Sequence, residues 1–108
     1  MTVSTLYAAA VEAVRQNGLP DYDGTFAGHT IGLEAREFPY TVGPTEKLND
    51  HFLPPTSDIP LEVGTVLNLE VPCGVFGTGG MQIEYSLIVT ASGYEFLVPQ
   101  ERHLEVVP

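Results

Sequence analysis

The sequence predicts an α+β fold in which one long N-terminal helix precedes an antiparallel β-sheet. Apolar residues recur with helical spacing near the N-terminus, whereas apolar and polar residues alternate along the second half of the chain. Glycine-rich turns separate these alternating segments. The first pattern indicates an amphipathic helix and the second indicates strands with one buried face. With 108 residues, the chain is long enough for one small domain.

The first element is a helix predicted over residues 2–17. Its apolar stripe has the i, i+3, i+4, i+7 and i+11 spacing of one helix face and consists of Val3, Leu6, Tyr7, Ala10 and Val14. Thr2 or Ser4 can cap the N-terminus, because a side-chain oxygen there accepts a hydrogen bond from a free backbone N–H. Gly18 lies where a left-handed C-terminal cap is expected, and Pro20 prevents the helix from continuing.

The rest of the chain divides into loops and strands. Residues 21–24 have the composition of a turn, and four prolines over residues 41–60 predict an irregular loop. Strands are predicted over residues 65–71, 81–90 and 94–98, and the tail over residues 99–108 adds a candidate edge strand. The connection between the first two strands is predicted to contain Val75, Phe76, Gly77, Gly79 and Gly80.

The composition excludes some classes of function. Four basic residues stand against fourteen acidic ones, which gives a formal net charge of −10 and a pI near 4.3. A nucleic-acid-binding surface needs a basic patch, so we predict no nucleic-acid partner, whereas the negative field attracts cations. The sequence lacks an apolar run of about 18 residues and a signal pattern, so we predict no membrane partner. The single cysteine fits a reducing compartment, and we predict a cytoplasmic protein.

Two predicted strands each carry one glutamate among polar neighbours. Alternation places Glu70 with Asn68, and Glu84 with Gln82 and Ser86, on the face opposite the apolar residues. If the two strands pair, Glu70 and Glu84 project from the same face of the sheet. Two close carboxylates repel each other unless a proton or a cation lies between them, which points to a metal. The simpler alternative is that this face is solvated and both glutamates are ordinary surface acids.

His29 is the third candidate ligand. Gly28 and Gly32 on either side of it allow close backbone approach, which suits an imidazole presented into a cleft. A structural histidine within the fold is the alternative. Cys73 has no second cysteine to pair with and is predicted to be a small buried filler. One imidazole and two carboxylates suit Mn, Fe, Co or Zn at a hydrolytic site better than a structural thiolate site would.

Three segments of the chain resemble the motifs of a known family. Residues 28–39 read GHTIGLEAREFP and resemble the Gly-His-x-Ile-Gly-Leu-x-x-His-Glu-x-Pro segment of the pita-bread-fold metallopeptidases. That family includes Xaa-Pro aminopeptidases, prolidase and methionine aminopeptidases, with creatinase as a metal-free relative. Residues 61–72, LEVGTVLNLEVP, resemble its strand ending in Asn-x-Glu, and residues 79–90, GGMQIEYSLIVT, resemble its Ile-Glu-Asp strand.

The resemblance implies a fold, a metal site and an activity. It implies that residues 1–108 form a single partial catalytic domain, the C-terminal half of a pita-bread domain with a curved antiparallel sheet. It makes His29, Glu70 and Glu84 three of the family's five metal ligands, with two divalent ions in the complete site. Glu70 also takes a proton from the metal-bound water. The implied reaction is hydrolysis of a peptide bond near the N-terminus of the substrate.

The chain departs from the family in two respects. The family's two aspartate ligands lie well upstream of the histidine, and this chain lacks the strand pair that carries them. Arg36 follows His29 by seven residues, where active peptidases carry a histidine. A guanidinium can bind an oxyanion or a carboxylate, which makes Arg36 a candidate catalytic and substrate-binding residue, but it cannot act as a neutral imidazole. The alternative for Arg36 is a salt bridge with Glu34 or Glu37.

Three functional hypotheses follow from the resemblance and the departures. The first is a fragment of a metal-dependent hydrolase of the Xaa-Pro aminopeptidase or dipeptidase type, with manganese or another divalent metal as its cofactor. The second is a creatinase-like enzyme that acts on a small metabolite, which Arg36 favours. The third is an inactive half-domain that forms a homodimer or associates with a missing N-terminal half. We expect these 108 residues alone to be catalytically incompetent.

Overall fold

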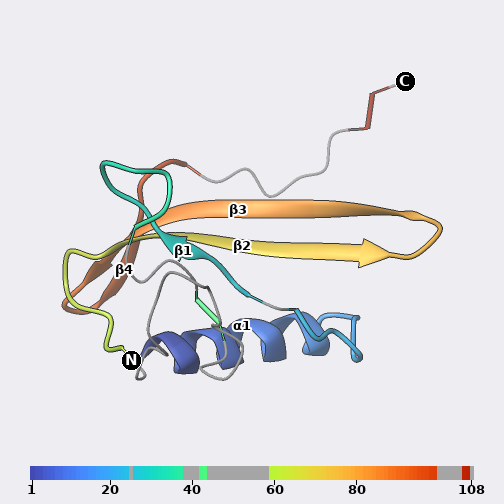
Figure 1. The fold of residues 1–108 in the computed structure, drawn as a ribbon, viewed down its shortest axis with the longest axis horizontal. Coiled ribbons are helices and arrows are strands. Elements are labelled where there is room, and N and C mark those ends of the chain that lie inside the picture. Colours follow the sequence, from blue (N-terminus) through green and yellow to red (C-terminus); the bar gives the residue numbers. More distant parts are fainter. Residues whose placement is uncertain (25, 38–41, 44–58, 100–105, 108) are drawn as a thin grey trace.

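The computed structural model describes residues 1–24, 26–37, 42–43, 59–99 and 106–107. Its elements in chain order are α1 (Val3–Gln16), β1 (His29–Thr30), β2 (Val66–Val75), β3 (Gly79–Thr90) and β4 (Gly93–Phe96). The strands form one antiparallel sheet in the order β1-β2-β3-β4. α1 lies along one side of the sheet, and residues 31–37 extend on the other side (Figure 1). The predicted α+β architecture of a helix followed by an antiparallel sheet is confirmed.

The helix has the end signals that the sequence predicts. Thr2 is the N-cap, and its Oγ1 accepts a hydrogen bond from the backbone N–H of Thr5 at 3.4 Å. At the other end, Asn17 is the C-cap and Gly18 adopts a φ of +111°, a left-handed conformation that glycine adopts without steric strain. The helix therefore begins and ends within one residue of the predicted range.

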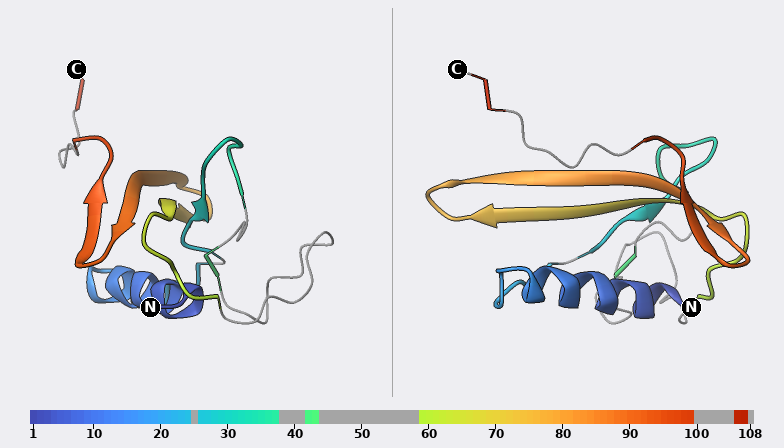
Figure 2. Two further views of the ribbon diagram at one scale, coloured as in Figure 1. Left: turned by 90° about the vertical axis from the view of Figure 1, so that its left-hand side faces the viewer. Right: turned by 180° about the vertical axis from the view of Figure 1, so that it is seen from behind.

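The hydrophobic core lies between α1 and the side of the sheet that faces it (Figure 2). Its buried members are Val3, Ala27, Val42, Leu67 and Leu87, and the partly buried residues around them are Leu6, Tyr7, Ala10, Ile59, Leu61, Leu69 and Val89. Successive residues of a strand point to opposite faces. Because alternate residues of β2 and β3 pack toward α1, the residues between them point to the other side of the sheet.

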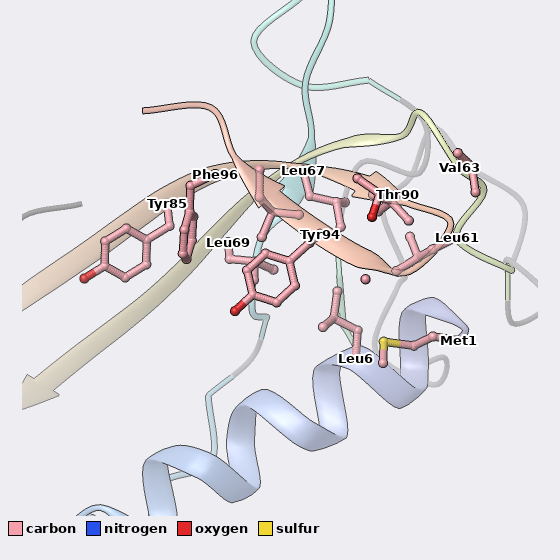
Figure 3. A pocket seen from close by; sticks show the side chains of 13 residues that line it. Met1, Leu6, Leu61, Val63, Leu67, Leu69, Tyr85, Thr90, Tyr94 and Phe96 are labelled. Atoms are coloured by element: carbon pink, nitrogen blue, oxygen red, sulfur yellow. The ribbon is translucent and has the colours of Figure 1, made fainter. Parts of the chain in front are cut away.

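An apolar cavity of about 500 Å³ opens between α1 and the β3–β4 end of the sheet (Figure 3). Leu6 lines it from the helix and Leu69 from β2. On β4, Tyr94 and Phe96 line the cavity, although 60% and 40% of their surfaces are exposed. Side chains of the described residues therefore leave an unfilled space between α1 and this end of the sheet.

The central hairpin is longer than the sequence predicts. β2 continues to Val75 rather than ending at residue 71, and β3 already begins at Gly79. Assigning Val75, Gly79 and Gly80 to the connection is therefore wrong. Backbone pairing continues to Val75 and Gly79, and the turn closes when the backbone N–H of Thr78 donates to the carbonyl of Val75 at 3.0 Å. β4 begins at Gly93 and ends at Phe96, close to the predicted 94–98.

Pro72 interrupts the hydrophobic run of β2 without ending the strand. β1 pairs only with Leu67 and Asn68, so the described strands leave one edge of β2 free at Pro72. Proline lacks a backbone N–H and is tolerated where a strand needs no donor on that side. The hydroxyl of Tyr22 donates to the Pro72 carbonyl at 3.0 Å. Cys73 follows and is half-buried, less than predicted for a buried filler.

Some sequence predictions fall outside the described residues. The loop predicted over residues 41–60 and the edge strand predicted over residues 99–108 lie mostly in segments that the structure does not describe. Within the described part, no helix is long and apolar enough to cross a bilayer.

Candidate metal-binding site

The strand register places two carboxylates side by side. Glu70 of β2 is the Cα partner of Glu84 of β3, and directly opposite residues of an antiparallel pair project from the same face. This face points away from α1, toward the side on which residues 31–37 extend (Figure 2). The prediction that Glu70 and Glu84 share one face of the sheet is confirmed.

β1 brings His29 to this same polar face. His29 is the Cα partner of Asn68, two residues before Glu70 along β2, and it is 7% exposed. The close approach of the two strands depends on Gly28, which has a φ of +136°. A Cβ atom at this position would lie 2.2 Å from the carbonyl oxygen of Asn68. Glycine is therefore required here on two grounds, conformation and space.

One hydrogen bond favours a single tautomer of the His29 imidazole. Its Nδ1 lies 3.0 Å from the carbonyl oxygen of Thr30. A carbonyl only accepts hydrogen bonds, so Nδ1 carries a proton, and in the neutral ring Nε2 then holds the lone pair. A backbone carbonyl that orients the other ring nitrogen is the usual outer contact of a metal-ligating histidine. His29 thus suits ligation through Nε2.

Amide side chains connect the two glutamates into a network. Gln82 Nε2 donates to Glu70 Oε2 at 2.6 Å and also to Glu84 Oε1. Asn68 Nδ2 donates to Glu84 Oε2 at 3.0 Å, and the Ser86 hydroxyl donates to Asn68 Oδ1 at 3.1 Å. Sequence reasoning placed these polar residues on this face but did not predict their contacts. Asn68, Gln82 and Ser86 each lie two residues from a glutamate on the same strand, and this spacing predicted that they share its face.

The paired glutamates have different surroundings. Glu70 is 3% exposed, whereas Glu84 is exposed to solvent. Arg36 Nη2 lies 3.5 Å from Glu70 Oε1, and the Arg36 side chain remains 57% exposed. Oε1 of Glu70 is buried, and it accepts no hydrogen bond from any described residue. The description of Glu70 as an ordinary surface acid is therefore wrong.

The alternative salt bridge of Arg36 with a neighbour in its own loop is not formed. Among the described residues, Arg36 pairs with Glu70. The Glu37 carboxylate instead accepts a hydrogen bond from the backbone N–H of Glu34 at 3.0 Å. The loop is tied to β1 because the backbone N–H of Glu37 donates to the Thr30 carbonyl at 3.1 Å. This anchoring holds Arg36 over the carboxylate of Glu70.

The electrostatic effects on the two carboxyl groups have opposite signs. Desolvation raises the pKa of Glu70, and the neighbouring Glu84 raises it further, while His29 and Arg36 oppose the rise. Hydrogen bonding, first of all from Asn68, lowers the pKa of Glu84. Of the two carboxyl groups, Glu70 is thus the one that holds a proton more readily in the metal-free site.

One imidazole and two carboxylates are chemically suited to a divalent cation, and one of their oxygens lacks a hydrogen bond. A buried carboxylate oxygen without a hydrogen bond is costly, and a cation would satisfy Glu70 Oε1. In this conformation, the described His, Cys, Asp and Glu side chains include no group of three that could hold an ion together. The assignment of His29, Glu70 and Glu84 as metal ligands, and of Arg36 as a catalytic residue, stays a prediction.

Comparison with known proteins finds a metallopeptidase family and two dipeptidases that are similar to this chain. Metallopeptidase family M24 matches residues 1–91. The chain is 28% identical to the Xaa-Pro dipeptidase of Pyrococcus furiosus over 104 residues, which cover 96% of this chain and 26% of that protein. It is 27% identical to the Xaa-Pro dipeptidase of Lactobacillus delbrueckii subsp. lactis over 108 residues, covering 100% and 26% of the two chains.

A solved structure supports the same relationship at the level of the fold. The X-Pro aminopeptidase from Thermotoga maritima superposes with a TM-score of 0.73 at 29% sequence identity, covering 99% of this chain and 27% of that one. The chain therefore spans about a quarter of the length of the relatives it matches. Its helix and antiparallel sheet form part of a pita-bread domain, and the chain belongs to metallopeptidase family M24.

Proposed function

We propose that this chain supplies His29, Glu70 and Glu84 to the divalent-metal centre of a hydrolase that cleaves Xaa-Pro peptides. The observation that carries the proposal is the buried Oε1 of Glu70, which accepts no hydrogen bond and has the Arg36 guanidinium 3.5 Å away. Because the chain spans about a quarter of its relatives, the complete centre needs residues from elsewhere in the protein. Two upstream aspartates complete a site for two ions, which would be manganese, cobalt, iron or zinc.

The roles of the residues follow from their positions. When bound, the metal would lower the pKa of a water molecule and polarise the scissile carbonyl. Glu70 would take the proton from the attacking water, because its carboxylate is buried and its Oε1 accepts no hydrogen bond. His29 offers Nε2 from a ring that the Thr30 carbonyl orients. Glu84 stays ionised through its hydrogen bonds and supplies negative charge for cation binding.

Arg36 is the proposed substrate-binding residue. It extends from an anchored loop on the polar face of the sheet, and more than half of its side chain is exposed. A guanidinium in this place can donate to the developing oxyanion or to a substrate carboxylate. The same observation supports a second candidate function, in which the enzyme acts on a small carboxylate-bearing metabolite rather than on a peptide.

The remaining proposals concern the protein as a whole. We place it in the cytoplasm with a peptide or small-molecule substrate and with neither nucleic-acid nor membrane partners. Residues 1–108 are one partial catalytic domain, which alone is an inactive half-domain. The apolar cavity beside β4 supports association with an N-terminal half of the domain or with a second copy of the chain.

A titration of the complete protein with Mn²⁺ tests the proposed centre. Glu70→Gln removes the charge and one ligand oxygen while keeping the shape of the side chain. We therefore expect Mn²⁺ binding to weaken by more than about 100-fold, which is more than the loss of a contact outside the ligand shell would cause. Glu12→Gln is the matched control, because Glu12 lies on the exposed surface of α1 and accepts a hydrogen bond from Gln16. Equal Mn²⁺ affinity of wild type and Glu70→Gln would contradict the proposal.

Arg36→His separates the two candidate functions. In the complete protein loaded with Mn²⁺, the imidazole should raise the cleavage of proline dipeptides if a peptide is the substrate of this site. Unchanged dipeptide cleavage, together with lost affinity for small carboxylates, would favour the metabolite enzyme instead.

A further inference from the structure

Gln82 lies between the two carboxylates of the polar face. Its Nε2 donates to Glu70 Oε2 at 2.6 Å and to Glu84 Oε1. A primary amide nitrogen carries two N–H groups, so one side chain can serve both carboxylates at once. The other amide of the network, Asn68, reaches only Glu84, and Arg36 reaches only Glu70. Within the described ranges, Gln82 is the residue that hydrogen-bonds to both glutamates.

The strand pairing explains why the amide turns toward the glutamates. Gln82 on β3 is directly opposite Pro72 on β2. The proline ring has no group that can accept a hydrogen bond, so it offers the amide no partner across the strands. Glu70 and Glu84 form the next pair on the same face, two residues along each strand. Their oxygens are the acceptors to which the amide of Gln82 donates.

The bridging contact opposes a repulsion that the register creates. Directly opposite like charges destabilise an antiparallel pair. Glu70 is buried, so water screens its charge poorly against Glu84. A donor that binds both carboxylates offsets this repulsion and fixes the orientation of each group. It engages Oε2 of Glu70, whereas the buried Oε1 accepts no hydrogen bond and lies 3.5 Å from Arg36 Nη2.

We propose that Gln82 is a positioning residue that clamps Glu70 and Glu84 in one relative orientation. The clamp keeps Glu70 Oε1, which Arg36 approaches at 3.5 Å without a hydrogen bond, available for a metal cation. This inference deepens the proposed function, because the cation is the one proposed above. The clamp itself is a property of the metal-free protein and is testable without the metal.

A double-mutant cycle in the presence of a chelator tests the clamp. Gln82→Met keeps the length of the side chain but removes the donor, and we expect it to lower the Tm of the full chain by about 3–8 °C. In a Glu84→Met background the repulsion is absent, so the same substitution should lower the Tm by less than half as much. An equal loss of Tm in both backgrounds would overturn the clamp.

Gln16→Met is the matched control for this cycle. Gln16 donates to Glu12 at 2.8 Å on the exposed surface of α1, so the chemistry is the same but the acceptor is a single solvated carboxylate. We expect its Tm to change by less than about 1 °C, because exposed helix pairs contribute little. A Tm loss as large as that of Gln82→Met would show that losing any Gln–Glu contact suffices, and would overturn the proposal.

Titration with Co²⁺ tests the consequence for the metal. Gln82→Met should weaken Co²⁺ binding by about 10–100-fold and alter the visible absorption bands of the bound ion, because the ligand orientation changes. Unchanged affinity and spectrum would overturn the positioning role. If the complete wild-type protein binds no Co²⁺ while the cycle shows coupling, the proposed metal centre fails and the clamp stands. The two failures are thus distinguishable.

Discussion

The two faces of the β2–β3 hairpin are built by different forces. The face toward α1 is held by packed apolar side chains, with Leu67 only 1% exposed at its centre. The opposite face is held by hydrogen bonds among Asn68, Glu70, Gln82 and Glu84. Apolar packing is non-directional, whereas hydrogen bonds require a defined geometry. The comparison teaches that packing on one face determines where the hairpin lies, and hydrogen bonds on the other determine how its polar side chains are oriented.

Because the two faces are built differently, we expect substitutions on them to affect different properties: folding stability for the apolar face and metal binding for the polar face. A change on the apolar face should lower the free energy of unfolding whether or not a metal is present. A change on the polar face should act first on ligand binding, and it should affect stability only where the backbone itself has to move. The predictions below break or sharpen this contrast, in order of decreasing expected effect.

Leu67→Ala attacks the centre of the apolar face. Leu67 is almost completely buried, so truncation leaves a cavity between α1 and the sheet. We expect the free energy of unfolding to fall by about 2–5 kcal/mol, measured by urea denaturation. Leu33→Ala is the control, because the Leu33 side chain is fully exposed and its loss should be nearly neutral. Similar losses in both variants would contradict the assignment of the core.

Gly28→Ala tests the backbone that supports the polar face. An added Cβ would require a strained φ near +136° and would lie 2.2 Å from the Asn68 carbonyl oxygen. We expect a loss of about 1–3 kcal/mol in unfolding free energy, with displaced NMR signals of His29 and Asn68. Gly74→Ala provides the comparison, because a Cβ at Gly74 meets nothing within 4 Å. Unperturbed His29 signals in Gly28→Ala would refute the close approach of β1 and β2.

Tyr22→Phe tests the contact at the far end of the hairpin. It removes the hydrogen bond to the Pro72 carbonyl, so we expect a loss of about 0.5–1.5 kcal/mol in unfolding free energy at pH 7.

The effect of Tyr22 should also depend on pH. Desolvation raises the pKa of Tyr22 above 10.0, and the charges of Cys73, Tyr7 and Asp23 add to the rise. The folded protein therefore holds this proton more tightly than the unfolded chain. Its contribution to stability is present below pH 10 and is lost as the pH rises through the folded-state pKa. The stability gap between wild type and Tyr22→Phe should narrow in this range, and a constant gap from pH 7 to pH 11 would contradict the shift.

The sequence determined the elements whose signals are local. The limits of α1 depend on a cap at Thr2 and a glycine at 18, and both act through neighbouring backbone groups. Alternation likewise placed Glu70 and Glu84 opposite the apolar residues of their strands, so that they share a face once the two strands pair. Those two signals, together with the three family motifs, were enough to predict the fold and the candidate ligands. The end of β2 was mispredicted, since Pro72 is tolerated only because the strand beside it is short.

Only the tertiary structure decided how the two glutamates differ. They are direct partners in the register, yet Glu70 is buried and Glu84 is exposed. Glu70 lies on the strand next to β1, and the loop that follows β1 carries Arg36 onto its carboxylate. Local sequence patterns reveal the face on which a side chain lies, but burial depends on segments brought from elsewhere in the chain. The raised pKa of Glu70 and the ion pair of its buried Oε1 with Arg36 arise from that long-range packing.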